Sequence, residues 1–309
     1  MNSIAIALRG MAMGMAEVVP GVSGGTIAFI TGIYERLIKA IKTILSPSII
    51  RSFREGGMLG FWQAIDGRFV LTLGVGMVLG IGLGVFGVSY LLTNHQEPLW
   101  GFFFGLILAS VLYVGQQVDQ WHVRSILALV FGTAIAYGIT ILNPSMGSQN
   151  LLYIFLGGVI AISALILPGI SGSFILLLMG LYTTVIPAVK AVIKMEDLSQ
   201  LKIVLVFGLG CLVGLASFSR VLSWTFSRYR NSTLAILAGF MLGSLNKIWP
   251  WRNVLETRVN FSGEKVPLLE VSVLTKYYEG DAQILLVLVC MVIGFVMVYG
   301  LDRLGKNKL

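Results

Sequence analysis

Six long runs of apolar residues alternate along the chain with short polar segments. Each run is close to the length that a helix needs to cross the hydrocarbon core of a bilayer, and each is bounded by polar or charged residues. The sequence therefore predicts an all-α polytopic membrane protein. The six expected membrane-spanning helices cover residues 69–93, 98–115, 125–142, 201–226, 232–248 and 284–304.

Two further apolar stretches are interrupted by helix-breaking residues. They read EVVPGVSGGTIAFITGIYERLI (17–38) and LILPGISGSFILLLMGLYTTVI (165–186), and they share eight identities in the nineteen positions that begin at Pro20 and Pro168. Proline lacks a backbone N–H and disfavours helix in the residue before it, while glycine adopts backbone angles closed to other residues. A helix is expected to stop and restart in each stretch.

Non-helical backbone at membrane depth persists only where it is buried in protein or lines a wet cavity. One Pro-Gly pair would be explained by a kinked helix, but a matched pair favours two re-entrant hairpins whose tips meet. After each tip a half-helix starts with unpaired N–H groups and the positive end of its dipole, which favour an anion. The expected anion-binding residues are Pro20, Gly21, Ser23, Gly24, Gly25 and Thr26 of the first tip, and Pro168, Gly169, Ser171, Gly172 and Ser173 of the second.

The order of the motifs repeats along the chain. GVGMVLG at 74–80 parallels GLGCLVG at 208–214, and GFFFG at 101–105 parallels GFMLG at 239–243. Small-residue packing explains each motif alone, but not the same order twice. Three expected spans follow each hairpin, and this odd number predicts an inverted repeat. The first repeat is 1–147, with a re-entrant hairpin at 3–45 and an amphipathic cytoplasmic linker at 46–68; the second is 148–309, with a hairpin at 151–189 and an external loop at 250–282.

Basic residues mark the expected cytoplasmic side. The chain from Arg36 to Arg68, which leads up to the first span, carries six of them, whereas the loops at 93–97 and 143–150 carry none. By the positive-inside rule, this segment and both termini are cytoplasmic. The same rule explains the net charge of +8, so no nucleic-acid partner is needed. The six residues are Arg36, Lys39, Lys42, Arg51, Arg54 and Arg68.

Glu17, Arg36 and Arg220 have uncharged residues at the matching positions of the other half. Ionisable residues within a bilayer are costly and mark functional sites. Two roles are open for Glu17, as a group that titrates and carries protons or as a counter-charge for an arginine. Arg220 either binds phosphate with its guanidinium fork or reaches toward the inner surface. We assign Arg220 to the substrate site, facing an interior cavity, and Glu17 and Arg36 to charge coupling.

Several function classes find no support in the sequence. No cluster has metal-ligand spacing, no serine has a nearby base, and no nucleotide-binding phosphate loop is present. The two cysteines, Cys211 and Cys290, fall inside expected spans and give no disulfide framework. We therefore expect no enzyme activity, no cofactor and no bound metal.

Three stretches carry a family resemblance: MGMAEVVPGVSGGTIAFITGIYERLI, LPGISGSFILLLMGLY and GSLNKIWPW. Together they resemble the PopT-type undecaprenyl-phosphate translocase family of bacteria, formerly a domain of unknown function, over essentially the whole chain. The resemblance implies a flippase of the bacterial cytoplasmic (inner) membrane. Such a protein returns undecaprenyl phosphate from the outer leaflet to the cytoplasmic leaflet, where it is reused for peptidoglycan and other envelope polymers.

The residues by themselves indicate only an anionic ligand that is moved across a membrane. A polyprenyl phosphate fits this description, because its headgroup suits opposed half-helix N-termini and its tail can stay in lipid. A transporter of a small soluble anion or ion through the same site is the alternative, and a lipid phosphatase would need a nucleophile or metal cluster that we do not find. Our hypothesis for coupling is a proton carried by Glu17; no pattern specifies the oligomeric state.

Overall fold

The computed structural model describes residues 2–19, 21–145, 147–259 and 265–306, so the predicted site residue Pro20 lies outside it. The described chain is mostly helical, as expected. Its α-helices are α1 (Ser3–Glu17), α2 (Gly24–Ile30), α3 (Tyr34–Ile44), α4 (Ser48–Ala64), α5 (Gly67–Asn94), α6 (Gln96–Gln116), α7 (Val123–Ile141), α8 (Leu151–Ile166), α9 (Gly172–Leu178), α10 (Tyr182–Ile193), α11 (Leu201–Arg228), α12 (Arg230–Ser244) and α13 (Ile284–Lys306).

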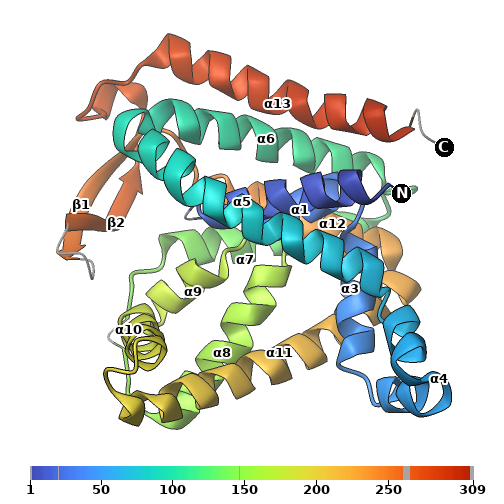
Figure 1. Ribbon diagram of the computed structural model, residues 1–309. Helices are drawn as coiled ribbons and strands as arrows, with labels where there is room; N and C mark the ends of the chain where they lie inside the picture. The colour runs from blue at the N-terminus through green and yellow to red at the C-terminus, as the bar shows by residue number, and fades with distance from the viewer. Residues whose placement is uncertain (1, 20, 146, 260–264, 307–309) are drawn as a thin grey trace.

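The two halves of the chain pack by the same pattern (Figure 1). Helix α1 packs along α5 in the first half, as α8 packs along α11 in the second. Helix α6 packs along α13, as α12 packs along α7. Each of these last two pairs takes one helix from each half, so the halves interlock.

Glycines at matching positions allow the close helix contacts of the two halves. A Cβ added to Gly80 on α5 would collide with the backbone oxygen of Met11, and one added to the matching Gly214 on α11 would meet that of Val159. The paired GFFFG and GFMLG motifs likewise place glycines of α6 and α12 against the backbones of α13 and α7. Small residues let membrane helices approach closely, so the repeated motifs encode repeated packing.

The predicted helix breaks are confirmed. Helix α1 ends at Glu17 and α2 begins at Gly24, while α8 ends at Ile166 and α9 begins at Gly172. Gly21 and Gly169, at matching positions of the breaks, have φ values of +86° and +88°, the left-handed region that favours glycine. Helices α9 and α10 then meet at an angle of 115°, the geometry of a broken span or a re-entrant loop.

Four of the six expected spans are long and apolar enough to cross a membrane among the described residues: α5, α6, α7 and α11. Helix α12 ends at Ser244 rather than at 248, because the chain turns there toward a strand. The apolar part of α13, Ile284–Gly300, is also shorter than a full span. The expected linker at 46–68 forms α4, none of whose described side chains is buried.

The expected external loop at 250–282 contains a β-hairpin that the sequence analysis did not predict. Strand β1 (Arg252–Val259) pairs antiparallel with β2 (Lys265–Ser272). The indole of Trp251 donates a hydrogen bond of 2.8 Å to the carbonyl of Ala282 and fastens the loop at its base. In Figure 1 the hairpin lies at the end of the molecule opposite the start of α1 and helix α4.

Candidate functional site

The tips of the two broken stretches are in direct contact. The N–H of Gly169 donates a hydrogen bond of 3.0 Å to the hydroxyl of Thr26, and the hydroxyl of Ser23 donates to the carbonyls of Leu165 and Leu167 at 3.3 and 3.2 Å. Ser23 and Thr26 are completely buried. The predicted contact between the tips is confirmed, and these two hydroxyls join one tip to the other.

The start of α2 is already capped by a carboxylate of the chain itself. The N–H of Gly24 donates a hydrogen bond of 2.8 Å to Oε1 of Glu17, and the hydroxyl of Ser23 accepts from Gly25 at 3.1 Å. Glu17 therefore occupies the position where the dipole of α2 favours an anion. No lysine or arginine in the described part of the chain forms an ion pair with Glu17. An external anion at the first tip would have to displace this carboxylate from the N–H of Gly24.

The second tip has a different arrangement. Leu165 stands where the first half has Glu17, and no side chain caps the start of α9. The hydroxyls of Ser171 and Ser173 lie 2.8 Å from each other. Beside them is a gap of about 10 Å³, which is room for one water. Its lining includes Gly21, Gly169 and Ser171 from the tips, Thr140 from α7 and Lys247.

Lys247 is the site residue that the sequence analysis missed. It follows the end of α12, lines the gap, and places its ammonium 4.8 Å from the centroid of the Phe174 ring on α9. A Cβ added to Gly21 would lie 3.1 Å from Cγ of Lys247, so the lysine also contacts the first tip. One cation thus lies against both tips. The available signal was a lysine at the end of an apolar run, inside the stretch GSLNKIWPW.

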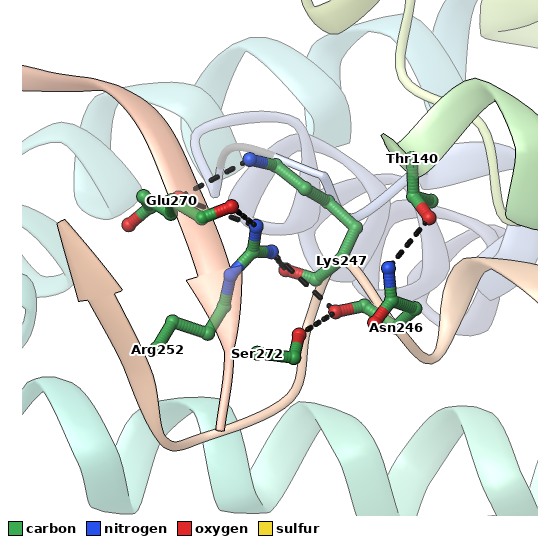
Figure 2. A network of polar contacts seen from close by, with 6 residues as sticks. All are labelled: Thr140, Asn246, Lys247, Arg252, Glu270 and Ser272. Atoms are coloured by element: carbon green, nitrogen blue, oxygen red, sulfur yellow. Dashed lines mark hydrogen bonds and ion pairs between the residues drawn. The ribbon is translucent and has the colours of Figure 1, made fainter. Parts of the chain in front are cut away.

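Lys247 is paired with the β-hairpin (Figure 2). Its ammonium lies 3.2 Å from Oε2 of Glu270 on β2, and Nη2 of Arg252 on β1 lies 3.8 Å from the same oxygen. The side chains of Lys247, Glu270 and Arg252 are 17%, 16% and 8% exposed. A mostly buried cluster therefore holds two cations and one carboxylate.

Backbone contacts fasten the hairpin to the turn that follows α12. The guanidinium of Arg252 donates to the backbone oxygen of Lys247, and at 3.2 Å to that of Glu270. Ser272 donates to the carbonyl of Asn246 at 3.0 Å, and the amide of Asn246 donates to Thr140 at 2.7 Å. Figure 2 shows these contacts running from the strands through the turn to α7.

Arg36 does not lie with the tip residues. Its guanidinium forms a two-pronged pair with Asp66, at 2.6 and 3.0 Å, and lies 4.3 Å above the centroid of the Phe69 ring. Both charged side chains are about two-fifths exposed. The hydrogen bond from Arg36 holds the pKa of Asp66 below its usual value. This pair fastens α3 to the start of α5.

Arg220 is exposed, so the expectation that it faces an interior cavity is wrong. Its guanidinium donates to the carbonyl of Leu45 at 2.8 Å and to that of Ala216 at 3.2 Å. Leu45 is the C-cap of α3, at the helix end where carbonyls lack intrahelical partners and a cation is favourable. The contact therefore joins α11 to the end of α3 and does not involve the tips.

Comparison with known proteins gives the following matches. A family model described as undecaprenyl phosphate translocase-like matches residues 13–266. The chain is 46% identical over 311 residues, covering 99% of this chain and 98% of its match, to a polyprenyl-phosphate transporter of Vibrio cholerae serotype O1 (strain ATCC 39315 / El Tor Inaba N16961). It is also 33% identical over 255 residues to a polyprenyl-phosphate transporter of Staphylococcus aureus (strain NCTC 8325 / PS 47). That match covers 79% of this chain and 85% of the relative. No solved structure matches the chain.

Proposed function

We propose, from the premise that this chain belongs to the undecaprenyl phosphate translocase-like family, that it carries undecaprenyl phosphate from the outer to the cytoplasmic leaflet of the bacterial inner membrane. The names of the two relatives support a polyprenyl phosphate as the cargo. In this role the chain returns the carrier lipid for another round of envelope-polymer synthesis. The tail stays in lipid while the headgroup crosses through the protein.

The observation that carries the proposal is the position of Lys247 against both tips. A phosphate monoester brings a charge of about −1.5 to −2 at neutral pH, and such a charge needs a cation and hydrogen-bond donors wherever water is excluded. The gap beside Lys247 offers the ammonium, the Ser171 hydroxyl and glycine backbone that an anion can approach closely. We therefore place the headgroup between the second tip and Lys247.

The gap must widen before a headgroup enters. Its volume of about 10 Å³ holds one water, which is far less than a phosphate needs. The structure is therefore a closed arrangement, and the headgroup enters when the tips and Lys247 separate. Interlocked halves of inverted orientation would open toward the two sides of the membrane in turn, with the termini cytoplasmic and the β-hairpin outside. The matched packing of the two halves supports this interpretation.

Glu17 supplies a means of coupling transport to protons. Its carboxylate accepts a charge-assisted hydrogen bond from the first N–H of α2. Protonation weakens this bond and leaves the start of α2 open to another acceptor, such as the phosphate. Proton binding at Glu17 and headgroup binding at the tips then favour each other.

Reconstitution in liposomes tests the function. The purified chain is given a fluorescent polyprenyl monophosphate, and a membrane-impermeant quencher reports the fraction in the outer leaflet. The proposal predicts rapid loss of the accessible lipid in liposomes that contain the protein and slow loss in empty ones. A parallel assay measures uptake of inorganic phosphate. Uptake of inorganic phosphate without lipid movement would support the soluble-anion alternative instead.

A further inference from the structure

Resting on the headgroup site proposed above, we propose that Glu270 is a positioning residue that competes with the lipid phosphate for Lys247 and so drives headgroup release. Glu270 lies on the external hairpin, outside both tips. Neither the family match nor the names of the relatives assign a role to this carboxylate. Three geometric observations lead to it.

The first observation is that the Lys247 ammonium lies near both the carboxylate of Glu270 and the second tip. The ammonium of Lys247 lies 3.2 Å from Oε2 of Glu270 and 4.8 Å from the centroid of the Phe174 ring, and Lys247 also lines the gap at the tips. Its side chain is mostly buried, so it makes these contacts from a confined position. A phosphate in the gap and the carboxylate of Glu270 must therefore share or exchange this cation.

The second observation is that the displaced carboxylate has another partner within reach. Nη2 of Arg252 already lies 3.8 Å from Oε2 of Glu270. Nε of Arg252 is buried and has no hydrogen-bond acceptor among the described residues. A buried donor without an acceptor is costly, so a carboxylate that moves toward Arg252 gains a hydrogen bond as it leaves Lys247.

The third observation is that the hairpin remains attached during this exchange. Arg252 donates to the backbone oxygens of Lys247 and Glu270, and Ser272 donates to that of Asn246. None of these bonds uses the carboxylate of Glu270. The side chain can therefore move between Lys247 and Arg252 while β1 and β2 keep their place beside the site.

Two states follow from this geometry. In the empty state Lys247 pairs with Glu270, as the structure has it; in the loaded state Lys247 pairs with the phosphate and Glu270 with Arg252. No buried charge is left unpaired in either state, so neither state carries the free-energy cost of an unpaired buried charge. The return of Glu270 to Lys247 weakens the hold on the phosphate, and this lets the headgroup leave after it has crossed.

The test is a binding measurement on the full chain in lipid nanodiscs, with farnesyl monophosphate and inorganic phosphate as separate probes. Glu270→Gln removes the carboxylate that competes for the Lys247 ammonium. The variant should therefore bind farnesyl monophosphate about tenfold more tightly than the parent chain, the change in affinity expected for one partly buried charge pair. Transport in liposomes should slow, because release becomes limiting. Glu256→Gln, an exposed carboxylate of β1, is the matched control and should change neither quantity.

Two further variants make the result decisive. In a Lys247→Met background, the change Glu270→Gln should no longer tighten binding, because no cation is left to compete for. Glu270→Asp keeps the charge and shortens its reach, so it should tighten binding by less than Glu270→Gln; it also serves if Glu270→Gln does not fold. Binding by either Glu270 variant that is unchanged or weaker than in the parent chain overturns the inference.

The outcomes separate this inference from the proposed function. If the parent chain binds farnesyl monophosphate and Glu270→Gln does not tighten it, only the role of Glu270 is wrong. If the parent chain binds neither probe, the headgroup site is wrong and the inference falls with it. Tighter binding of inorganic phosphate than of farnesyl monophosphate would contradict a lipid cargo, while an effect of Glu270 on both probes would still support the competition.

Discussion

The backbone N–H of Gly169 donates a hydrogen bond of 3.0 Å to the hydroxyl of Thr26, a residue 143 positions earlier in the chain. This buried bond connects the tips of the two broken stretches. Thr26→Val keeps the shape of the side chain and leaves the Gly169 N–H without an acceptor. We expect a loss of about 1–3 kcal/mol in the free energy of unfolding. Thermal unfolding in detergent measures it.

Two controls accompany that measurement. Thr26→Ser keeps the hydroxyl and should retain most of the stability. Thr43→Val removes an exposed hydroxyl that bonds within α3, and it should change the free energy of unfolding by less than about 0.5 kcal/mol. A Thr26→Val protein as stable as the parent chain would show that the bond between the tips contributes nothing.

Gly169 is expected to tolerate no side chain. Its φ of +88° is unfavourable for other residues, and an added Cβ would lie 2.8 Å from Cα of Met241. Gly169→Ala should therefore cost at least about 1–3 kcal/mol from backbone strain alone. Gly74→Ala is the control, because that helical glycine has open space where the Cβ would lie. Equal yields and melting temperatures for the two variants would contradict this account of the tip.

The pair of Arg36 and Asp66 predicts a dependence of stability on pH. Because Arg36 lowers the folded-state pKa of Asp66, the pair contributes stability above the unfolded pKa of Asp66, near 4, and loses it as pH falls through the folded value. Both side chains are about two-fifths exposed, so screening limits the contribution to roughly 1 kcal/mol or less.

Asp66→Asn tests this pair without disturbing the backbone, since asparagine also tolerates the φ of +54° at this position. The variant should be less stable than the parent chain at pH 7, and the two should converge as pH is lowered below about 4. Melting temperatures of the variant and the parent chain, measured from pH 7 to below about pH 4, test this prediction. A stability difference that does not change with pH would assign the effect to packing rather than to the charge.

Glu17→Gln separates a proton carrier from a structural cap. Glutamine keeps the size of the side chain, and its Oε1 can still accept the N–H of Gly24, so the fold and headgroup binding should persist. If Glu17 carries protons, the variant should lose most of the pH dependence of lipid uptake in liposomes. Lower stability in detergent, with the pH profile of the remaining transport unchanged, would instead make Glu17 a structural residue.

Local chemistry explains which parts of the fold could be predicted. The breaks at 18–23 and 167–171 follow from proline and glycine, whose backbone limits act within a few residues. The repeated glycine motifs lie at close helix contacts in both halves, because small residues let helices approach each other. The β-hairpin was missed because its strands lie in a loop that charge counting alone had assigned to the outside.

The parts of the site that depend on distant contacts could not be read from the sequence. Arg220 was assigned to the interior because it lies within the expected span 201–226. Its partner in the structure, the carbonyl of Leu45, lies 175 positions away and could not be identified from the sequence. Glu17 stood out in the sequence as a charge with no counterpart in the other half, but only the folded tip shows that its carboxylate caps Gly24. Lys247 lay within the expected span 232–248. Its proximity to both tips depends on the end of α12 at Ser244, three residues before the lysine.

Transport by a Lys247→Met variant tests the central claim most directly. Methionine keeps the length and packing of the side chain but removes the cation beside both tips. With Lys276→Met, an exposed lysine that follows β2, as the control, leaflet-specific movement of labelled polyprenyl monophosphate is measured in liposomes. The account predicts a loss of at least about tenfold for Lys247→Met and none for Lys276→Met, both with normal reconstitution. Transport at the parent rate by Lys247→Met would contradict the proposed headgroup site.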